Sequence, residues 1–229
     1  MFLKYVSDMF LFCYRSSCFS YNGCVNLLLL LLFIFVYSPA VSSGIEYPVK
    51  KLMIFGDSLT AGYGLEKTNS FSEKLSRALK SRGRNVKIIL SSVSGDTTSG
   101  GKARIDWALA EKPDAVLIEL GANDGLRGIN PKVSQNNLDY IIKKLQKHQV
   151  RALLAGMLAP PNLGREYGDE FNNIYSSLAK KYNILYYPFF LEGVVANPQL
   201  NQADGIHPNS IGVDEIVKRM LPLIMKLVR

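Results

Sequence analysis

Apolar and polar positions follow two recurring patterns along residues 51–229. Short continuous apolar runs, typical of buried strands, alternate with longer segments whose apolar residues return at helical spacing. The predicted strands cover residues 51–55, 86–90, 115–120, 151–157 and 184–187. The predicted helices cover residues 68–82, 100–110, 131–149, 166–181 and 209–228. This alternation predicts an α/β fold, in which helices cover both faces of a parallel sheet.

The periodicity also groups residues on the faces of individual helices. In helix 100–110, Ala103, Trp107 and Ala110 share one side. In helix 131–149, Val133 and Leu138 are expected to point inward, together with Ile141, Ile142 and Leu145.

Four polar, glycine-containing segments follow predicted strands or precede the last helix. They are Gly56–Leu59, Ser94–Asp96, Gly121–Asp124 and Asp204–Pro208. Right-handed crossovers bring the C-terminal ends of parallel strands to one edge of a sheet. Ligands bind at that edge in open α/β sheets. The four segments are therefore expected to gather into one site.

Ser58 is the candidate nucleophile of this site, because it follows the first apolar run in a sharp turn. A serine nucleophile needs a base, and the base needs an acceptor that orients it. The chain has two histidines. His148 lies at the basic end of a predicted helix, where a surface role suits it. His207 follows Asp204 by three residues, so His207 is the expected general base and Asp204 the residue that orients it. Gly, Asp and Ser are also common turn and helix-capping residues, so a purely structural role for this turn stays open.

Acyl transfer also needs donors that face the oxygen on which negative charge develops. The backbone N–H groups of Ser58 and Gly95 and the side-chain amide of Asn123 are the candidates. A plain turn glycine and an Asn that caps a helix are the alternative interpretations of Gly95 and Asn123.

Residues 1–42 differ from the rest of the chain. An unbroken apolar run covers residues 27–36, two bases and one acid precede it, and small residues follow it. This pattern is typical of a secretory signal peptide, with cleavage expected after Ala40 or Ser42. The protein is therefore expected to be exported, to the periplasm or outside the cell. A membrane anchor formed by residues 25–41 is the alternative. Cys13, Cys18 and Cys24 all precede the apolar run, so the domain over residues 43–229 has no cysteine and no disulfide framework.

The net charge of +8 does not by itself indicate a nucleic-acid partner. The basic residues are scattered over polar helix faces without interleaved aromatic residues, which favours a solvated surface over nucleic-acid binding. Transient contact with an anionic membrane surface remains an alternative. The sequence contains no His-Glu-x-x-His, P-loop or Gly-x-Gly-x-x-Gly motif, so no metal and no other cofactor is expected.

The four segments resemble the four motif blocks of the SGNH (GDSL) hydrolases and occur in the family order. Residues 56–65 and 94–98 are similar to the exported bacterial branch of acyl-CoA thioesterases, lysophospholipases and arylesterases. The resemblance implies a flavodoxin-like three-layer α/β/α fold with a five-stranded parallel sheet. It implies that Ser58, Asp204 and His207 are catalytic, and that Ser58, Gly95 and Asn123 form the oxyanion hole. Residues 156–161 differ from the family pattern, since a more polar residue is expected after Met157.

These observations predict a serine esterase or thioesterase that acts through an acyl-Ser58 intermediate. The expected partners are small acyl esters, acyl thioesters or lysophospholipids, and a monomer is expected. Two loops that flank the site are expected to bind the acyl chain through Leu126, Ile129, Leu158 and Pro160. A carbohydrate O-acetyl esterase acting on cell-wall polysaccharide and a non-catalytic binding module on the same fold are the alternatives.

Overall fold

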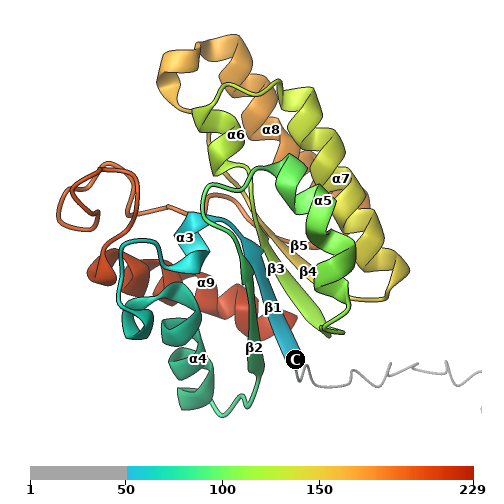
Figure 1. The fold of residues 1–229 in the computed structure, drawn as a ribbon, viewed down its shortest axis with the longest axis vertical. Coiled ribbons are helices and arrows are strands. Elements are labelled where there is room, and N and C mark those ends of the chain that lie inside the picture. The colour runs from blue at the N-terminus through green and yellow to red at the C-terminus, as the bar shows by residue number, and fades with distance from the viewer. Residues whose placement is uncertain (1–50) are drawn as a thin grey trace, which may run out of the picture. The chain divides into compact units, whose positions relative to one another are not determined.

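The five predicted strands pair into one parallel sheet in the order β2-β1-β3-β4-β5 (Figure 1). The computed structural model describes residues 51–229. The strands are β1 (Lys51–Gly56), β2 (Lys87–Ser92), β3 (Ala115–Glu119), β4 (Arg151–Ala155) and β5 (Leu185–Tyr187). All four neighbouring pairs are parallel, so the C-terminal ends of the strands meet at one edge of the sheet. The α/β fold class is confirmed.

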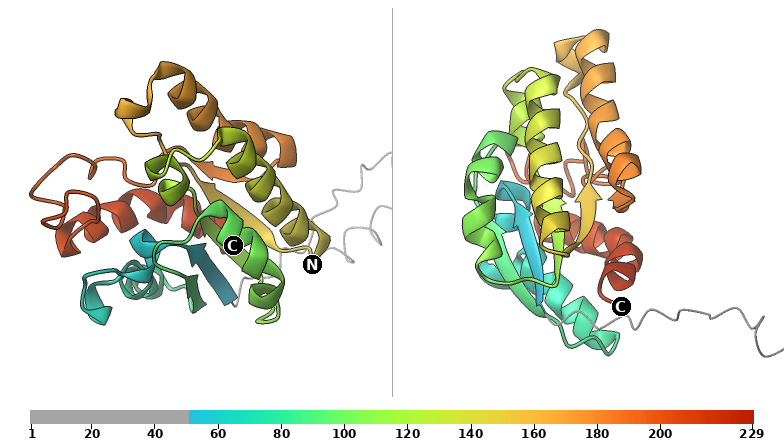
Figure 2. Two further views of the ribbon diagram at one scale, coloured as in Figure 1. Left: turned by 45° about the horizontal axis from the view of Figure 1, so that its top comes forward. Right: turned by 90° about the vertical axis from the view of Figure 1, so that its right-hand side faces the viewer.

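Helices cover both faces of the sheet. They are α3 (Ser58–Ala61), α4 (Phe71–Ser81), α5 (Thr98–Leu109), α6 (Ala122–Leu126), α7 (Pro131–Lys147), α8 (Arg165–Tyr182) and α9 (Ser210–Leu227), with short 3-10 turns η1 (Lys67–Asn69) and η2 (Pro161–Leu163). Helices α4 and α9 pack together on one face, whereas α5, α7 and α8 cover the other. Figure 2 shows the same three layers from two further directions.

Burial along the strands follows their position in the sheet. Every residue of β3 is buried, as is all of β1 except Lys51, because helices cover a central strand on both faces. Strand β2 lies at the edge and is half-exposed. Several helices begin at residues whose side chains accept a hydrogen bond from the first turn, among them Ser70, Thr97, Asn130 and Asn209.

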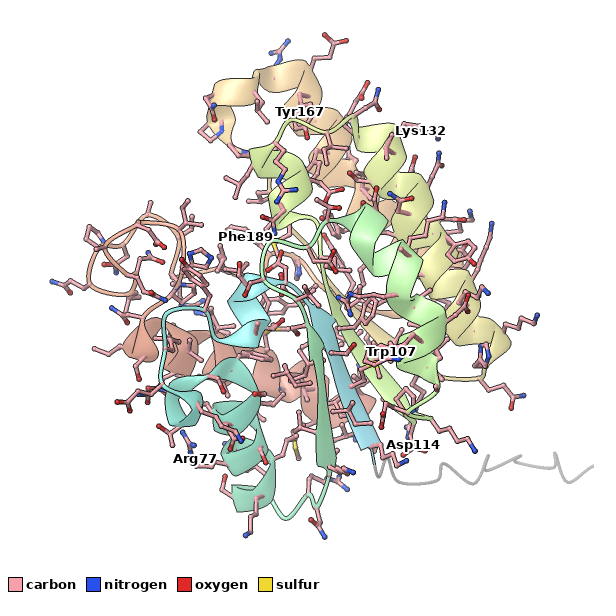
Figure 3. The ribbon with its side chains drawn as sticks, viewed as in Figure 1. Arg77, Trp107, Asp114, Lys132, Tyr167 and Phe189 are labelled. Carbon is pink, nitrogen blue, oxygen red and sulfur yellow. The ribbon has the colours of Figure 1, made fainter. Side chains whose placement is uncertain are left out.

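The structure shows which way two of the grouped helix faces point. On α5, the side that carries Trp107 faces solvent, and Trp107 itself is 74% exposed (Figure 3). Helix α5 instead meets the sheet through Gly101 and Ile105, and a Cβ at Gly101 would lie only 2.4 Å from Leu120 Cδ1. The inward orientation of Val133 is wrong, since this side chain is 43% exposed. Leu138, Ile141, Ile142 and Leu145 are buried as expected, so only Val133, in the first turn, lies beside the buried stripe of α7.

The short helices α3 and α6 were not predicted. With four and five residues, they are too short to show helical periodicity. The expectations for residues 1–42 lie outside the described residues. Within residues 51–229, no helix combines the length and the apolar composition that a membrane span requires.

Candidate active site

Ser58 lies in a tight turn at the C-terminal end of β1. It is the first residue of α3, and Asp57 before it caps that helix by accepting the Leu59 N–H at 3.0 Å. The turn leaves no room for a side chain at Gly56, where a Cβ would lie 2.2 Å from Thr60 Oγ1 and 2.6 Å from Glu119 Oε2. The capping role therefore belongs to Asp57, and the Ser58 hydroxyl remains available to the site.

The structure brings Ser58, His207 and Asp204 together across 149 residues of sequence. His207 Nε2 lies 2.9 Å from Ser58 Oγ, and His207 Nδ1 lies 2.7 Å from Asp204 Oδ2. The backbone N–H groups of His207 and Ile206 also donate to Asp204 Oδ1, at 3.0 and 2.9 Å.

These hydrogen bonds decide the protonation of the pair. The backbone N–H groups of His207 and Ile206, and then the His207 side chain, lower the pKa of Asp204 to about 2. Asp204 is therefore a carboxylate at neutral pH, and its Oδ2 atom accepts a hydrogen bond from the protonated Nδ1 of His207. In neutral imidazole this leaves Nε2 unprotonated and able to accept the hydroxyl proton of Ser58.

The loop that carries His207 is anchored on the turn after α3. Gln202 donates its backbone N–H to the His207 carbonyl at 2.8 Å, and its side-chain amide to the carbonyls of Tyr63 and Pro208 at 2.8 and 3.0 Å. The Tyr63 ring lies against the His207 ring, with 4.6 Å between their centroids. The roles of Tyr63 and Gln202 were not expected from the sequence.

Asn123 lies next to the Ser58 turn. Its Nδ2 atom donates to Asp57 Oδ2 at 3.2 Å and to the Asp96 carbonyl at 2.9 Å. Gly95, in the same loop as Asp96, has a φ of 79°, a conformation that favours glycine. Within residues 51–229 the Gly95 N–H donates no hydrogen bond, and the Gly95 carbonyl accepts from Arg127 Nη2 at 2.9 Å. Gly95 is not among the residues that line the cleft described below.

Arg104 joins the ends of β1 and β2 and was also missed by the sequence analysis. Its guanidinium donates to the Gly56 carbonyl at 3.0 Å and to Asp96 Oδ2 at 2.7 Å. It lies over the Phe55 ring, 3.9 Å from its centroid. Arg104 thereby ties the Ser58 turn to the loop that carries Gly95 and Asp96.

Two buried carboxyl groups lie beneath the Ser58 turn. Burial raises the pKa of Asp57 to about 6, although the Leu59 N–H and the Asn123 amide both oppose the rise. Burial, and then the neighbouring Asp57, raise the pKa of Glu119 well above its ordinary value. The sequence signal for Glu119 was a single acid at the end of an otherwise apolar strand.

An apolar cleft of about 600 Å³ opens beside Ser58 and His207. Of the expected acyl-binding residues, Leu126, Leu158 and Pro160 line it. Ile129 is not among the lining residues, so its expected role in acyl binding is not supported; its carbonyl accepts the Tyr167 hydroxyl at 2.8 Å. The cleft also has lining residues that were not expected from the sequence: Leu59, Ala122, Met157, Ala159, Phe189, Leu191, Val195, Gly205 and Ile206.

The segment after β5 supplies three of these residues: Phe189, Leu191 and Val195. Figure 3 shows Phe189 near the ends of the strands. The apolar run that follows Pro188 was the sequence signal for this wall of the cleft. Residues 51–229 contain no group of three or more His, Cys, Asp or Glu side chains placed to hold a metal ion.

Comparison with known proteins identifies the family to which the chain belongs. Residues 54–214 match the model of the GDSL-like lipase/acylhydrolase family. Arylesterase of Vibrio mimicus is 43% identical over 160 residues, which are 69% of this chain and 80% of that protein. Thioesterase 1/protease 1/lysophospholipase L1 of Escherichia coli K12 is 37% identical over 178 residues, which are 76% of this chain and 84% of that protein.

A solved structure agrees with this assignment. The crystal structure of TesA superposes with a TM-score of 0.75 at 37% identity, covering 78% of this chain and 99% of that one. The family match spans the strands and loops that carry Ser58, Gly95, Asn123 and His207. The chain therefore belongs to the GDSL-like lipase/acylhydrolase family, the SGNH hydrolases, and is a serine hydrolase.

Proposed function

We propose that the protein hydrolyses acyl esters and acyl thioesters through an acyl intermediate on Ser58. The observation that carries this proposal is the 2.9 Å contact between Ser58 Oγ and His207 Nε2 at the mouth of an apolar cleft. A nucleophile within hydrogen-bond reach of a base, which is itself oriented by a third group, is the arrangement that covalent acyl transfer requires.

The proposed first half-reaction forms the acyl enzyme. His207 Nε2 takes the hydroxyl proton while Ser58 Oγ attacks the acyl carbonyl carbon. The carbonyl oxygen becomes an oxyanion, and collapse of the tetrahedral intermediate breaks the bond to the leaving group. The imidazolium then gives its proton to the departing alcohol or thiol. The Asp204 carboxylate stabilises that imidazolium from 2.7 Å.

The second half-reaction regenerates the enzyme. Water gives a proton to His207 Nε2 and attacks the acyl carbon, the bond to Ser58 Oγ breaks, and Oγ takes the proton back. In both halves the N–H groups of Ser58 and Gly95 and the Asn123 amide are proposed to hold the oxyanion. The position of the Asn123 amide beside the Ser58 turn supports this assignment, and one of its two N–H groups, which donate to Asp57 and Asp96 in the structure, would turn to the oxyanion.

The cleft supports an acyl chain longer than acetyl. Its walls are mostly aliphatic side chains, with Leu126 and Leu158 on one side and Leu191 and Val195 from the segment after β5. Burial of apolar surface is worth about 25 cal/mol per Å², so each added methylene that fits strengthens binding. The names of the relatives include arylesterase, thioesterase and lysophospholipase, which are all acyl hydrolases.

A substrate panel tests this proposal. Purified protein is assayed with p-nitrophenyl esters from acetate to dodecanoate, an acyl thioester and a lysophospholipid, each with Ser58→Ala as the control. We expect kcat/KM to rise beyond acetate and the control to be inactive. A preference for acetyl groups on polysaccharide would favour the carbohydrate esterase instead. No turnover in the entire panel would favour the binding module.

We further propose that residues 1–42 direct export and that the mature enzyme is a monomer. The apolar run over residues 27–36 and the small residues after it support an export signal. N-terminal sequencing of the processed protein tests it, because cleavage after Ala40 or Ser42 is expected and an intact N-terminus would support the anchor over residues 25–41. Light scattering of the processed protein tests the monomer.

A further inference from the structure

Glu119 is a fully buried acid directly beneath the Ser58 turn. It is the last residue of β3, and the parallel register pairs it with Gly56, the last residue of β1. Its Oε2 atom accepts the backbone N–H of Asp57 at 3.2 Å and the hydroxyl of Thr60 at 2.9 Å. One carboxyl oxygen therefore holds the residue before Ser58 and the residue two positions after it.

The turn and the carboxyl group fit each other sterically. A Cβ at Gly56 would lie 2.6 Å from Glu119 Oε2 and 2.2 Å from the Thr60 hydroxyl that Glu119 binds. The absence of a side chain at Gly56 is what lets the carboxyl reach the Asp57 N–H. Glu119 thus occupies the space that the glycine of the Gly-Asp-Ser turn leaves free.

The contacts of Glu119 extend to both sides of the site. The Thr60 hydroxyl also lies 2.8 Å from the Ser92 hydroxyl at the end of β2, so the network joins the ends of three neighbouring strands. Asp57, whose N–H is held by Glu119, accepts the Asn123 amide through its own carboxyl group. Displacement of the turn would therefore move the Ser58 hydroxyl and the Asn123 amide together.

Glu119 is costly to keep at this position. Its Oε1 atom is buried and has no hydrogen-bond partner within the part of the chain that the structure describes. An unsatisfied buried polar group costs about 1–3 kcal/mol, and a retained one calls for an explanation. Its side-chain oxygen Oε2 accepts from the Asp57 N–H and the Thr60 hydroxyl, neither of which carries a positive charge, and the neighbouring titratable group is the acid Asp57. A neutral carboxyl group meets these surroundings at lower cost than a carboxylate.

We propose that Glu119 is a positioning residue for the reaction, which holds Ser58 in its reactive geometry by accepting the Asp57 N–H and the Thr60 hydroxyl. This inference rests on the proposed function, because it requires Ser58 to be the nucleophile. Only the acceptor oxygen is needed for this role, so the side-chain carbonyl of glutamine can take it over.

Two substitutions at Glu119 separate positioning from packing. Glu119→Gln keeps an acceptor oxygen and the side-chain shape, whereas Glu119→Leu keeps a similar volume without an acceptor. We expect kcat of Glu119→Gln to stay within about 3-fold of the wild type. We expect kcat of Glu119→Leu to fall by at least about 10-fold with KM changed less than about 3-fold, since small misplacement of a reacting group can cost up to about 10²-fold.

A destabilised variant remote from the site provides the matched control. Leu145 is buried near the C-terminal end of α7, and its carbonyl accepts the Val150 N–H directly before β4 begins, so it lies at the end of the strands away from Ser58. Leu145→Ala should lower Tm while leaving kcat unchanged. The positioning role is overturned if Glu119→Leu has the kcat of the wild type, or if Glu119→Gln loses as much kcat as Glu119→Leu.

Thr60 supplies the test if Glu119→Leu does not fold. Thr60→Val removes the hydroxyl that Glu119 binds at nearly constant volume, and Thr60→Ser retains it. A several-fold lower kcat in Thr60→Val alone is expected, and equal kcat in both variants overturns the proposal. Ser58→Ala is assayed in parallel. If Ser58→Ala remains active, the proposed function has failed, whereas an inactive Ser58→Ala beside a fully active Glu119→Leu contradicts the positioning role alone.

Discussion

The Nδ2 atom of Asn123 lies 3.2 Å from Oδ2 of Asp57, which joins the end of β3 to the turn that carries Ser58. The same Nδ2 atom donates to the Asp96 carbonyl at 2.9 Å. Two acceptors from two different loops therefore fix the orientation of one amide. Both N–H groups of this amide have acceptors in the structure, so one of them, the longer contact to Asp57 at 3.2 Å, must exchange its acceptor for the acyl oxygen when charge develops there.

Removal of that amide should slow the reaction strongly. We expect Asn123→Ala to lower kcat by about 10²–10³-fold, since loss of one oxyanion donor costs about 3–4 kcal/mol of barrier. Steady-state kinetics with a p-nitrophenyl ester measures the loss, and a thermal melt verifies the fold. Turnover close to that of the wild type would remove Asn123 from the mechanism.

Substitution of Asp204 by asparagine should impair His207 without disturbing its loop. Asparagine retains the Oδ1 atom that accepts the N–H groups of Ile206 and His207. Its amide would donate to His207 Nδ1 and leave the proton on Nε2, which then cannot accept from Ser58. The comparable change in a serine protease costs about 10⁴ in kcat, so we expect at least about 10²-fold here.

The pH profile of the wild type tests the same contact. The pKa of Asp204 is lowered to about 2, so Asp204 stays ionised down to well below pH 4. Any acid limb of kcat/KM above pH 4 must therefore come from a group other than Asp204. The residual activity of Asp204→Asn should show the same limb, and its disappearance in that variant would contradict this assignment.

Glu119→Gln should change how stability depends on pH. Burial raises the pKa of Glu119 in the folded protein, so the folded state holds this proton more tightly than the unfolded chain does. The stabilising contribution of Glu119 is then fully present below about pH 4, the ordinary range of glutamate, and is lost as the pH rises above it. Relative to Glu119→Gln, the wild type should lose up to about 1.4 kcal/mol of unfolding free energy per pH unit in that window. Denaturant titrations from pH 4 to pH 8 measure this, and a constant difference would contradict it.

Two glycine substitutions should have opposite outcomes. At Gly56 a Cβ would meet Glu119 Oε2 at 2.6 Å, whereas at Gly168 in α8 nothing lies within 4 Å. We expect Gly56→Ala to cost about 1–3 kcal/mol or more through overpacking and to abolish activity. Gly168→Ala should leave activity unchanged and the protein equally or slightly more stable, because alanine favours the helix. Equal Tm values for the two variants would show that the turn at Gly56 is not sterically closed.

The strands were predictable because central parallel strands are buried on both faces and read as continuous apolar runs. The side of each helix that contacts the sheet was less predictable. The periodicity of α5 grouped Trp107 with two alanines, yet the helix contacts the sheet through Gly101, whose lack of a side chain permits a close approach that hydrophobicity does not reveal.

The candidate site was predictable to the extent that its residues lie at strand ends. Ser58, Asn123 and His207 follow from topology, since parallel strands share one C-terminal edge. Glu119 and Arg104 were missed because their roles depend on side-chain contacts between elements far apart in sequence. The wall of the cleft formed by Phe189, Leu191 and Val195 was missed, because the short apolar segment after β5 has neither helical nor strand periodicity.

Covalent trapping tests the central claim, that Ser58 is the nucleophile, most directly. The folded protein is treated with a fluorophosphonate probe, and the modified peptide is identified by mass spectrometry. We expect one adduct, on Ser58, with no labelling of Ser58→Ala and much slower labelling of the His207→Ala variant, because His207 activates the hydroxyl from 2.9 Å. Labelling of another residue, or an equal rate for Ser58→Ala and the wild type, would contradict the account.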